Sequence, residues 1–347
     1  MINFGLGYMG SKSVIARDLI KLIPSGDRFV DAFAGGCAMT HAALLVGRWP
    51  KILANDIVEV PEFFVNAVKG QYRDETRWIS REDFFRLKDT DLFVRYCFSF
   101  GNDGRTYMYD AKLEPYKKAC HYAVVFDDWA DFMRLCPEVY ATAKAALEGK
   151  TDRKARRLAF GPAVVRKLRT LDAKIVNSNP LYRSVKRNTR SVQSGVVAAG
   201  SLQSLERLQS LECLERLEGL QALQSMEAVE RIQSLERLER IQSLECIPEH
   251  SLEARLGDYS TLEIRPGDVI YCDPPYRGTG GYNGKGFDHE AFYSWAAAQS
   301  VPVYISEYWM PEDRFMCIWE KKRQSRKSAK GTEGKAVEKL FVPRKRQ

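Results

Sequence analysis

The tetrapeptide Asp273-Pro274-Pro275-Tyr276 is the part of this 347-residue chain whose residue types and spacing point most directly to chemistry. It follows an apolar run, residues 267–272, that predicts a strand. Two prolines stop a strand and stiffen the backbone, so the acid and the aromatic beside them are held at the carboxyl edge of a sheet. A rigid carboxylate and a backbone carbonyl can accept both hydrogens of an exocyclic amine, while the ring stacks on the attached heterocycle. This is the chemistry needed to hold a flipped, amino-bearing base.

Such a tetrapeptide alone is usually an ordinary strand-ending turn, but a second pattern near the N-terminus supports the functional interpretation. Residues 28–33 predict a strand, 34–37 a tight turn of small residues, 38–46 a buried helix, and 51–56 a second strand that ends in Asp56. Strand, glycine-rich turn, helix, strand and acid follow one another as in a nucleotide-type βαβ unit. The expected fold class is therefore α/β with a Rossmann-like sheet.

The remaining elements follow from the same patterns. We expect helices over residues 14–23 and 287–298 and a strand over 301–306. Residues 321–346 are dense in Lys and Arg and predict a basic arm or hairpin. This segment suits either nonspecific contact with a DNA backbone or a solubilising tail.

Composition limits the possible functions. A length of 347 residues suggests about two domains. A net charge of +8 and a pI near 9.0 favour polyanionic partners. The chain has no apolar run long enough to span a membrane and no secretory signal at its start, so we expect a cytoplasmic protein. Eight cysteines without a CxxC pair and four scattered histidines predict reduced thiols and no metal site.

The middle of the chain interleaves aromatic with basic residues. This composition suits a surface that pairs with phosphates and stacks on bases, but it equally suits solvated helix faces over ordinary core aromatics. The candidate nucleic-acid-binding residues are Arg105, Lys117, Lys118, Arg166, Lys167 and Arg169.

Residues 202–247 form a repeat with an apolar residue at every third position. On an α-helix each step of three residues advances by about 300°, so the apolar stripe slides around the helix. A solenoid with short rungs could instead place every third residue inward. The content of Leu, Glu, Gln and Arg favours the helix slightly. We expect the repeat to be a spacer or an interaction element. The protein either self-associates through the repeat or is a monomer.

Taken together, these motifs resemble those of the Dam-like DNA adenine-N6 methyltransferases, in particular the alpha group of phage and prophage type. The resemblance covers residues 7–60 and 255–310 well and 95–122 moderately. It does not cover the repeat. The order of cofactor motifs, long middle region and Asp-Pro-Pro-Tyr is that of the alpha group, whose target-recognition domain lies in the middle.

The resemblance implies a role for each motif. Gly7-Tyr8-Met9-Gly10-Ser11-Lys12 is similar to the motif whose aromatic and lysine, here Tyr8 and Lys12, flank the methyl donor. Residues 31–36 are similar to the S-adenosylmethionine loop, with Cys37 in place of the usual final glycine. The implied cofactor-binding residues are Tyr8, Lys12, Asp31, Phe33, Gly35, Asp56 and Asp258, and the implied catalytic residues are Asp273, Pro274, Pro275 and Tyr276.

The implied domains are a catalytic domain (residues 1–60 and 251–347), a target-recognition region (61–200) and the repeat insertion (201–248). The implied activity is methyl transfer from S-adenosylmethionine to adenine N6 at a specific site in double-stranded DNA, in a bacterium or a phage-infected host, with restriction-modification as one setting. Cytosine N4 or an RNA base remains an alternative target because the amine chemistry is shared. A further alternative is a catalytically idle binding or assembly protein that uses the repeat.

Overall fold

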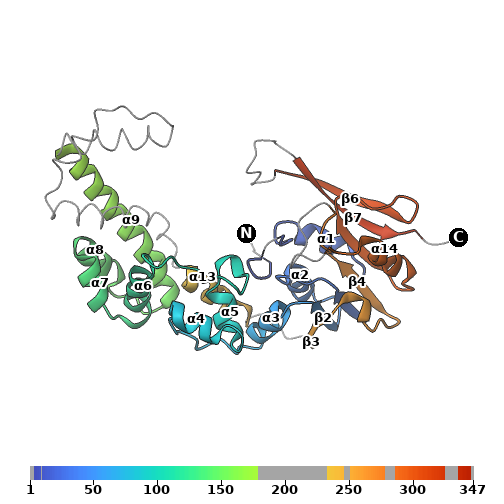
Figure 1. Cartoon of the computed structure of the whole chain (residues 1–347), viewed down its shortest axis with the longest axis horizontal. Helices are drawn as coiled ribbons and strands as arrows, with labels where there is room; N and C mark the ends of the chain where they lie inside the picture. The colour runs from blue at the N-terminus through green and yellow to red at the C-terminus, as the bar shows by residue number, and fades with distance from the viewer. Residues whose placement is uncertain are drawn as a thin grey trace. The chain divides into compact units, whose positions relative to one another are not determined.

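The computed structural model describes residues 4–8, 10–178, 233–245, 251–277, 286–324 and 335–344. These residues form two compact units (Figure 1). Unit 1 comprises Met1–Glu75, Leu87–Thr106 and Arg240–Gln347, and unit 2 comprises Thr76–Arg86 and Tyr107–Glu239, in each case as far as the structure describes them.

Unit 1 is built on a mixed seven-stranded sheet with the order β3-β2-β1-β4-β5-β7-β6. The first five strands pair in parallel, whereas β7 runs antiparallel to both β5 and β6. The order 3-2-1-4-5 is that of a doubly wound α/β sheet. The strands are β1 (Arg28–Asp31), β2 (Lys51–Asp56), β3 (Ser251–Leu256), β4 (Asp268–Cys272), β5 (Val303–Glu307), β6 (Phe315–Gln324) and β7 (Lys335–Pro343).

Helices cover both faces of this sheet because the central strands are apolar on both sides. Val30 and Ile270 face the helix α14 (His289–Ala298), which buries Phe292 against them. On the other face Phe29 packs on Trp49 with ring centroids 5.0 Å apart. The further helices of unit 1 are α1 (Ala16–Leu22), α2 (Ala38–Val46), α3 (Val60–Val68), α5 (Leu92–Cys97) and the short η1 (Phe100–Asn102) and η3 (Tyr259–Thr261).

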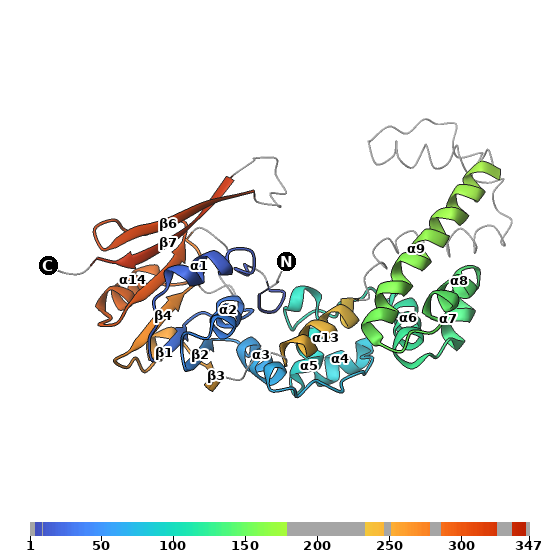
Figure 2. The ribbon, with the colours of Figure 1, turned by 180° about the vertical axis from the view of Figure 1, so that it is seen from behind.

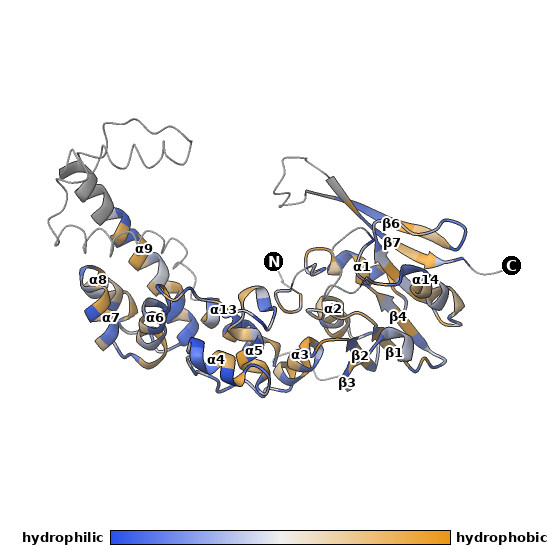
Figure 3. Ribbon diagram, in the orientation of Figure 1, coloured by the Kyte–Doolittle hydropathy of each residue, from blue (hydrophilic) through white to orange (hydrophobic). Residues whose placement is uncertain are grey.

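Unit 2 is helical in its described residues, and its aromatic residues are largely core. Tyr107 and Tyr109 are buried, and Trp78 stacks on Tyr109 at 5.4 Å. The helices are α4 (Arg81–Leu87), α6 (Glu114–Phe126), α7 (Ala130–Leu135), α8 (Pro137–Leu147) and α9 (Arg153–Ser178). In Figure 3 polar and apolar segments alternate along the coloured part of α9, as expected for a helix with one packed face.

The last part of the repeat is an α-helix, α13 (Gln233–Leu244). Every third residue is buried: Leu235, Leu238, Ile241 and Leu244. Successive members of this series are about 300° apart around the helix axis. The buried face therefore rotates around the helix from its beginning to its end. Arg157 of unit 2 pairs with Glu239, whereas within unit 1 Arg240 donates to the carbonyl of Gly5. The helical interpretation holds for these residues, and residues 202–232 and 246–247 lie outside the described ones.

Most predicted elements agree with the structure, and one strand is new. The strand β3 was not expected, because Ser-Leu-Glu-Ala-Arg-Leu lacks an apolar run; it is an edge strand. The basic C-terminal segment forms the hairpin that was one of its two predicted structures, since it contributes most of the antiparallel strands β6 and β7, visible side by side in Figures 1 and 2. Residues 61–75 and 87–106 lie in the same compact unit as the sheet, while the division into catalytic, target-recognition and repeat domains stays a prediction.

Residues 87–106 belong with the sheet because their aromatic side chains pack on α3 and its neighbours. Tyr96 lies 5.5 Å from Phe63, and Arg95 pairs with Glu59 at the start of α3. Phe93, Tyr96 and Phe98 are therefore core residues and are not available for stacking on bases, whereas Phe100 is exposed. No helix among the described residues is long and apolar enough to cross a membrane.

A buried ion pair joins the beginnings of β1 and β4. The guanidinium of Arg28 donates to both carboxylate oxygens of Asp268, at 2.9 and 2.6 Å. We expect Asp268→Asn to lower the free energy of unfolding by about 3 kcal/mol, because it leaves the Arg28 charge buried without its counter-charge. Thermal or urea unfolding of the full chain measures the change. Glu263→Gln, which removes an exposed ion pair with Arg265, is the control and should leave the transition unchanged; equal effects would contradict the prediction.

Candidate active site

The carboxyl ends of β1 and β4 are neighbours, and this is the point at which a doubly wound sheet binds ligands. The chain leaves β1 toward β2 on one side and leaves β4 toward β5 on the other, so the order reverses between them. Asp31 ends β1 and is in register with Tyr271, and Asp273 follows the last residue of β4. Two segments that are 240 residues apart in the sequence are thereby brought together.

Lys12 and Asp273 form an ion pair at this edge. The ammonium lies 2.8 Å from Oδ1 of Asp273, and the two side chains are only 6% and 18% exposed. Burial raises the pKa of Asp273, and the positive charge of Lys12 opposes that rise. The turn of residues 8–11, closed by a hydrogen bond from Ser11 N to the Tyr8 carbonyl, and the first turn before α1 position the lysine.

Tyr276 is fixed from three directions. Its hydroxyl donates to Oε2 of Glu338 at 2.9 Å, and the Lys12 ammonium lies 4.6 Å from its ring centroid. The ring of Tyr308 meets it edge-on at a centroid distance of 4.4 Å. Burial raises the pKa of Tyr276, so the phenol is protonated and acts as a hydrogen-bond donor. Pro274 is buried and Pro275 half-buried, which agrees with a rigid segment.

Two buried glutamates beside this cluster were not identified from the sequence. Glu338 lies on β7, and Glu307 ends β5, where it accepts hydrogen bonds from the backbone N–H groups of Tyr308 and Arg277 at 2.8 and 3.3 Å. Burial raises the pKa of Glu307 to about 7. The available signal was an acid in an otherwise apolar strand pattern, but Glu338 sits in a segment whose basic composition favoured a solvent-exposed arm.

The turn after β1 is tied to β2. Gly35 N donates to Oδ2 of Asp56 at 2.8 Å, and Gly35 has a φ of +45°. Tyr8 lies against this turn, since a Cβ on Gly36 would come within 2.6 Å of its Cβ. Cys37 adopts φ +59°, the left-handed conformation that a glycine would take without strain.

Asp31 is buried beneath this turn. Its Oδ2 accepts hydrogen bonds from the backbone N–H and the hydroxyl of Thr40, at 3.1 and 2.7 Å. Its Oδ1 is buried and has no hydrogen-bond partner among the described residues. Burial raises the pKa of Asp31 to about 7. A buried acceptor of this kind is suited to a donor or a positive charge brought by a ligand.

Asp56 and Asp258 lie at the ends of neighbouring strands. Burial raises the pKa of Asp56, and the backbone N–H of Gly35 opposes that effect. Asp258 is exposed and caps η3, accepting from the backbone N–H of Ser260 at 2.9 Å. Asn55 links the two positions, because its amide donates to the carbonyls of Ala32 and Gly257.

Phe33 belongs to an aromatic cluster on the α14 face. Its ring lies 5.1 Å from that of Tyr259 and 5.5 Å from that of Phe292. The side chain is half-buried, so part of the ring is accessible beside the turn.

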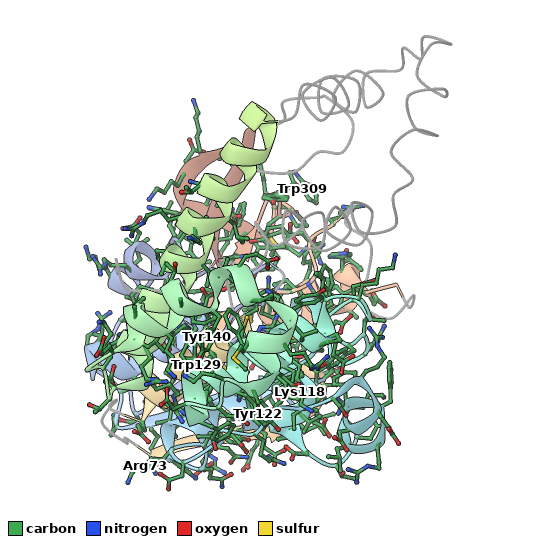
Figure 4. All side chains as sticks on the ribbon, turned by 90° about the vertical axis from the view of Figure 1, so that its left-hand side faces the viewer. Arg73, Lys118, Tyr122, Trp129, Tyr140 and Trp309 are labelled. Carbon is green, nitrogen blue, oxygen red and sulfur yellow. The ribbon has the colours of Figure 1, made fainter. Side chains whose placement is uncertain are left out.

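The basic candidates of the middle region are placed differently from one another. Arg105, Lys118, Arg166 and Arg169 are exposed, and Lys167 is half-buried. The Lys118 ammonium lies 5.4 Å from the ring centroid of Tyr122, a pair labelled in Figure 4. Lys117 corrects the prediction: it is 3% exposed, it lies over the Tyr109 ring at 5.7 Å, and burial lowers its pKa. Its side chain lies on the buried side of α6 and cannot reach a phosphate in this conformation.

No group of His, Cys, Asp and Glu that could hold a metal ion occurs among the described residues. Comparison with known proteins gives one informative result. A family model described as the D12 class N6 adenine-specific DNA methyltransferases matches residues 8–142. This range carries the Tyr8–Lys12 motif, the turn and Asp56, whereas Asp273 to Tyr276 lie beyond it. No curated protein matches the chain.

The match assigns the target atom, because the motifs alone left adenine N6 and cytosine N4 open. It also assigns the methyl donor, since methyltransferases of this class use S-adenosylmethionine. Over residues 8–142 the chain is similar to the D12 class of N6 adenine-specific DNA methyltransferases, and the activity that this match supports is methyl transfer from S-adenosylmethionine to adenine N6 of DNA.

Proposed function

We propose that the carboxyl edge of β1 and β4 is the place of methyl transfer, and that the enzyme is of the Dam-like phage type, acting at a specific site in double-stranded DNA. The observation that carries this proposal is the buried arrangement of Lys12, Asp273 and Tyr276 at the switch point of the sheet. It joins a motif inside the matched range to the tetrapeptide outside it.

The residues around the turn fit S-adenosylmethionine. The unpartnered Oδ1 of Asp31 offers an acceptor to a cationic group, and Asp56 offers a carboxylate beside the turn for ribose hydroxyls. The ring of Tyr8 lies against the turn and Phe33 precedes it, and aromatic rings attract a sulfonium. Asp258 would meet the cofactor adenine. When bound, S-adenosylmethionine supplies an activated methyl group, so no covalent enzyme nucleophile is needed.

The tetrapeptide then has a positioning task. Asp273 and the Pro274 carbonyl accept the two N6 hydrogens and draw the nitrogen toward tetrahedral geometry. Tyr276 stacks on the adenine after it has been flipped from the duplex. These contacts strengthen as positive charge develops on N6, which is the condition for lowering the barrier. The released proton passes to water, and no general base is assigned.

DNA binding is proposed for the exposed cations of unit 2 together with Arg105. Arg166 and Arg169 lie on α9, and Lys118 lies on α6. Two other arginines of α9 form contacts within unit 2: Arg156 donates to a backbone carbonyl near the end of α6, and Arg157 pairs with Glu239. The predicted target-recognition role of residues 61–200 is thus retained as a proposal for the part in unit 2. Self-association through the repeat remains a prediction.

Asp273→Asn keeps the shape of the side chain but removes its charge. We expect kcat for methyl transfer to fall at least about 100-fold, because an acceptor for the developing charge is weakened. Incorporation of labelled methyl groups into unmethylated genomic DNA, digested to nucleosides, measures the rate, and calorimetry should show unchanged cofactor binding. Asp313→Asn, at an exposed position, is the control. A wild-type rate for Asp273→Asn would refute the assignment of the site.

Asp56→Asn tests the cofactor site. The amide can still accept from Gly35 N, but it is a weaker acceptor for ribose hydroxyls. We expect the Kd for S-adenosylmethionine to rise about tenfold or more, with DNA affinity unchanged. Calorimetric titration of the full chain gives both values, and an unchanged Kd for the cofactor would remove Asp56 from the site.

Arg166→Gln combined with Arg169→Gln tests the DNA surface. If both side chains contact phosphates, the slope of log K against log salt should become less steep by about 2, because fewer counterions are released. Fluorescence anisotropy with duplex DNA over a range of KCl concentrations measures this slope. Arg134→Gln, on α7 of the same unit, is the matched exposed control. The same slope in the double variant and in the wild type would exclude these residues as phosphate contacts.

A further inference from the structure

Glu338 is a carboxylate in a place where a carboxylate is costly. It lies on β7 and is 5% exposed. It is paired with Lys321 of β6, and it is the residue of β7 next to Lys339, which pairs with the last residue of β5. Burying a charged group costs free energy unless partners compensate for it. An apolar residue would serve the strand equally well, so the contacts of Glu338 have to account for its presence.

Glu338 belongs to a third segment of the chain, and its contacts are with Tyr276 and Lys12 of the proposed site. Oε2 accepts the Tyr276 hydroxyl at 2.9 Å and lies 4.0 Å from the ammonium of Lys12. The same ammonium lies 2.8 Å from Asp273. Lys12 is therefore shared between two carboxylates, and the Tyr276 hydroxyl donates to Glu338.

We propose that Glu338 is a positioning residue for methyl transfer, which draws part of the Lys12 charge away from Asp273 and fixes the ring of Tyr276. This inference rests on the proposed roles of Asp273 and Tyr276. Glu338 itself acts only through Lys12 and Tyr276.

The charge of the cluster gives the physical reason. With Asp273 and Glu338 ionised and Lys12 protonated, the three groups together carry one negative charge beside the place where N6 becomes positive. Without the charge of Glu338, Lys12 pairs with Asp273 alone, and the cluster is neutral. A preorganised negative charge stabilises the transition state more than the ground state, so its loss lowers kcat rather than substrate affinity.

The other titratable groups near Glu338 form hydrogen bonds or ion pairs with other residues. The Tyr271 hydroxyl bonds the Ser306 hydroxyl at 2.7 Å, and Lys321 pairs with Asp18 at 2.7 Å. Glu307 receives backbone N–H groups from its own and a neighbouring segment. The Lys12 ammonium lies 4.0 Å from Oε2 of Glu338, within ion-pairing distance.

The test separates the charge of Glu338 from its hydrogen bond. Glu338→Gln retains an acceptor for Tyr276 but loses the charge, whereas Tyr276→Phe removes only the hydroxyl donor. The full-length single and double variants are compared with the wild type for kcat and for the KM of cofactor and DNA, using labelled S-adenosylmethionine and unmethylated genomic DNA. Glu320→Gln, an exposed carboxylate on the neighbouring strand β6, is the matched control.

We expect Glu338→Gln to lower kcat about 10- to 100-fold while both KM values stay within about twofold. Glu338→Asp, which keeps the charge, should recover part of the rate. In the double variant the two losses should be close to multiplicative, because Glu338→Gln removes the charge that acts through Lys12 and Tyr276→Phe removes the hydrogen bond that fixes the ring.

Two results would overturn the inference: a wild-type kcat for Glu338→Gln, or a rise in KM at unchanged kcat. If Glu338→Gln does not fold, Glu338→Asp, which moves the charge away from Lys12 and Tyr276, takes its place, and a wild-type kcat in both Glu338→Asp and Tyr276→Phe refutes the inference. A normal rate for Glu338→Gln with an inactive Asp273→Asn refutes only the inference. A normal rate for Asp273→Asn refutes the proposed site itself.

Discussion

The ion pair between Lys12 and Asp273 is the interaction on which the arrangement of the site depends. It joins the segment before α1 to the end of β4, and both partners are largely removed from water. In such surroundings each charge compensates the other, so removing either partner leaves a largely buried charge unpaired. The ring of Tyr276 and the carboxylate of Glu338 lie beside the same ammonium. The segment of Lys12 and the tetrapeptide thereby form one cluster, although most of the chain separates them.

A second constraint comes from the parallel sheet. Parallel strands place all their carboxyl ends on one edge, and the reversal of strand order leaves room between β1 and β4. Asp31, Asp56 and Asp273 all follow from that rule, because each ends or follows a strand. Their burial differs according to what covers them. Asp31 lies beneath the turn after β1 and bonds Thr40 of α2, while Asp56 holds that turn through Gly35.

The middle of the chain shows how composition can mislead. Aromatic and basic residues alternate there, and the sequence alone left a nucleic-acid surface and an ordinary core equally open. The structure shows which of these residues are buried and which are exposed. Tyr107, Tyr109 and Lys117 are buried, and Arg156 and Arg157 serve helix ends and ion pairs, whereas Lys118, Arg166 and Arg169 face solvent. Charge and aromaticity do not reveal which way a helix turns its side chains.

The sequence by itself determined the local elements and the residues at their ends: the strands before Asp31 and Asp56, the turn at Gly35, and the rigid tetrapeptide after β4. These follow from short-range patterns, because strand periodicity, glycine turns and prolines act within a few residues. Only the tertiary structure decided that Glu338 lies beside Lys12 and Tyr276, that Glu307 accepts the backbone N–H of Arg277, that β3 forms the edge of the sheet, and that Lys117 is buried. The physical reason is that such contacts join segments that the sequence keeps far apart, and their pairing depends on strand register and on what each side chain finds to compensate its charge.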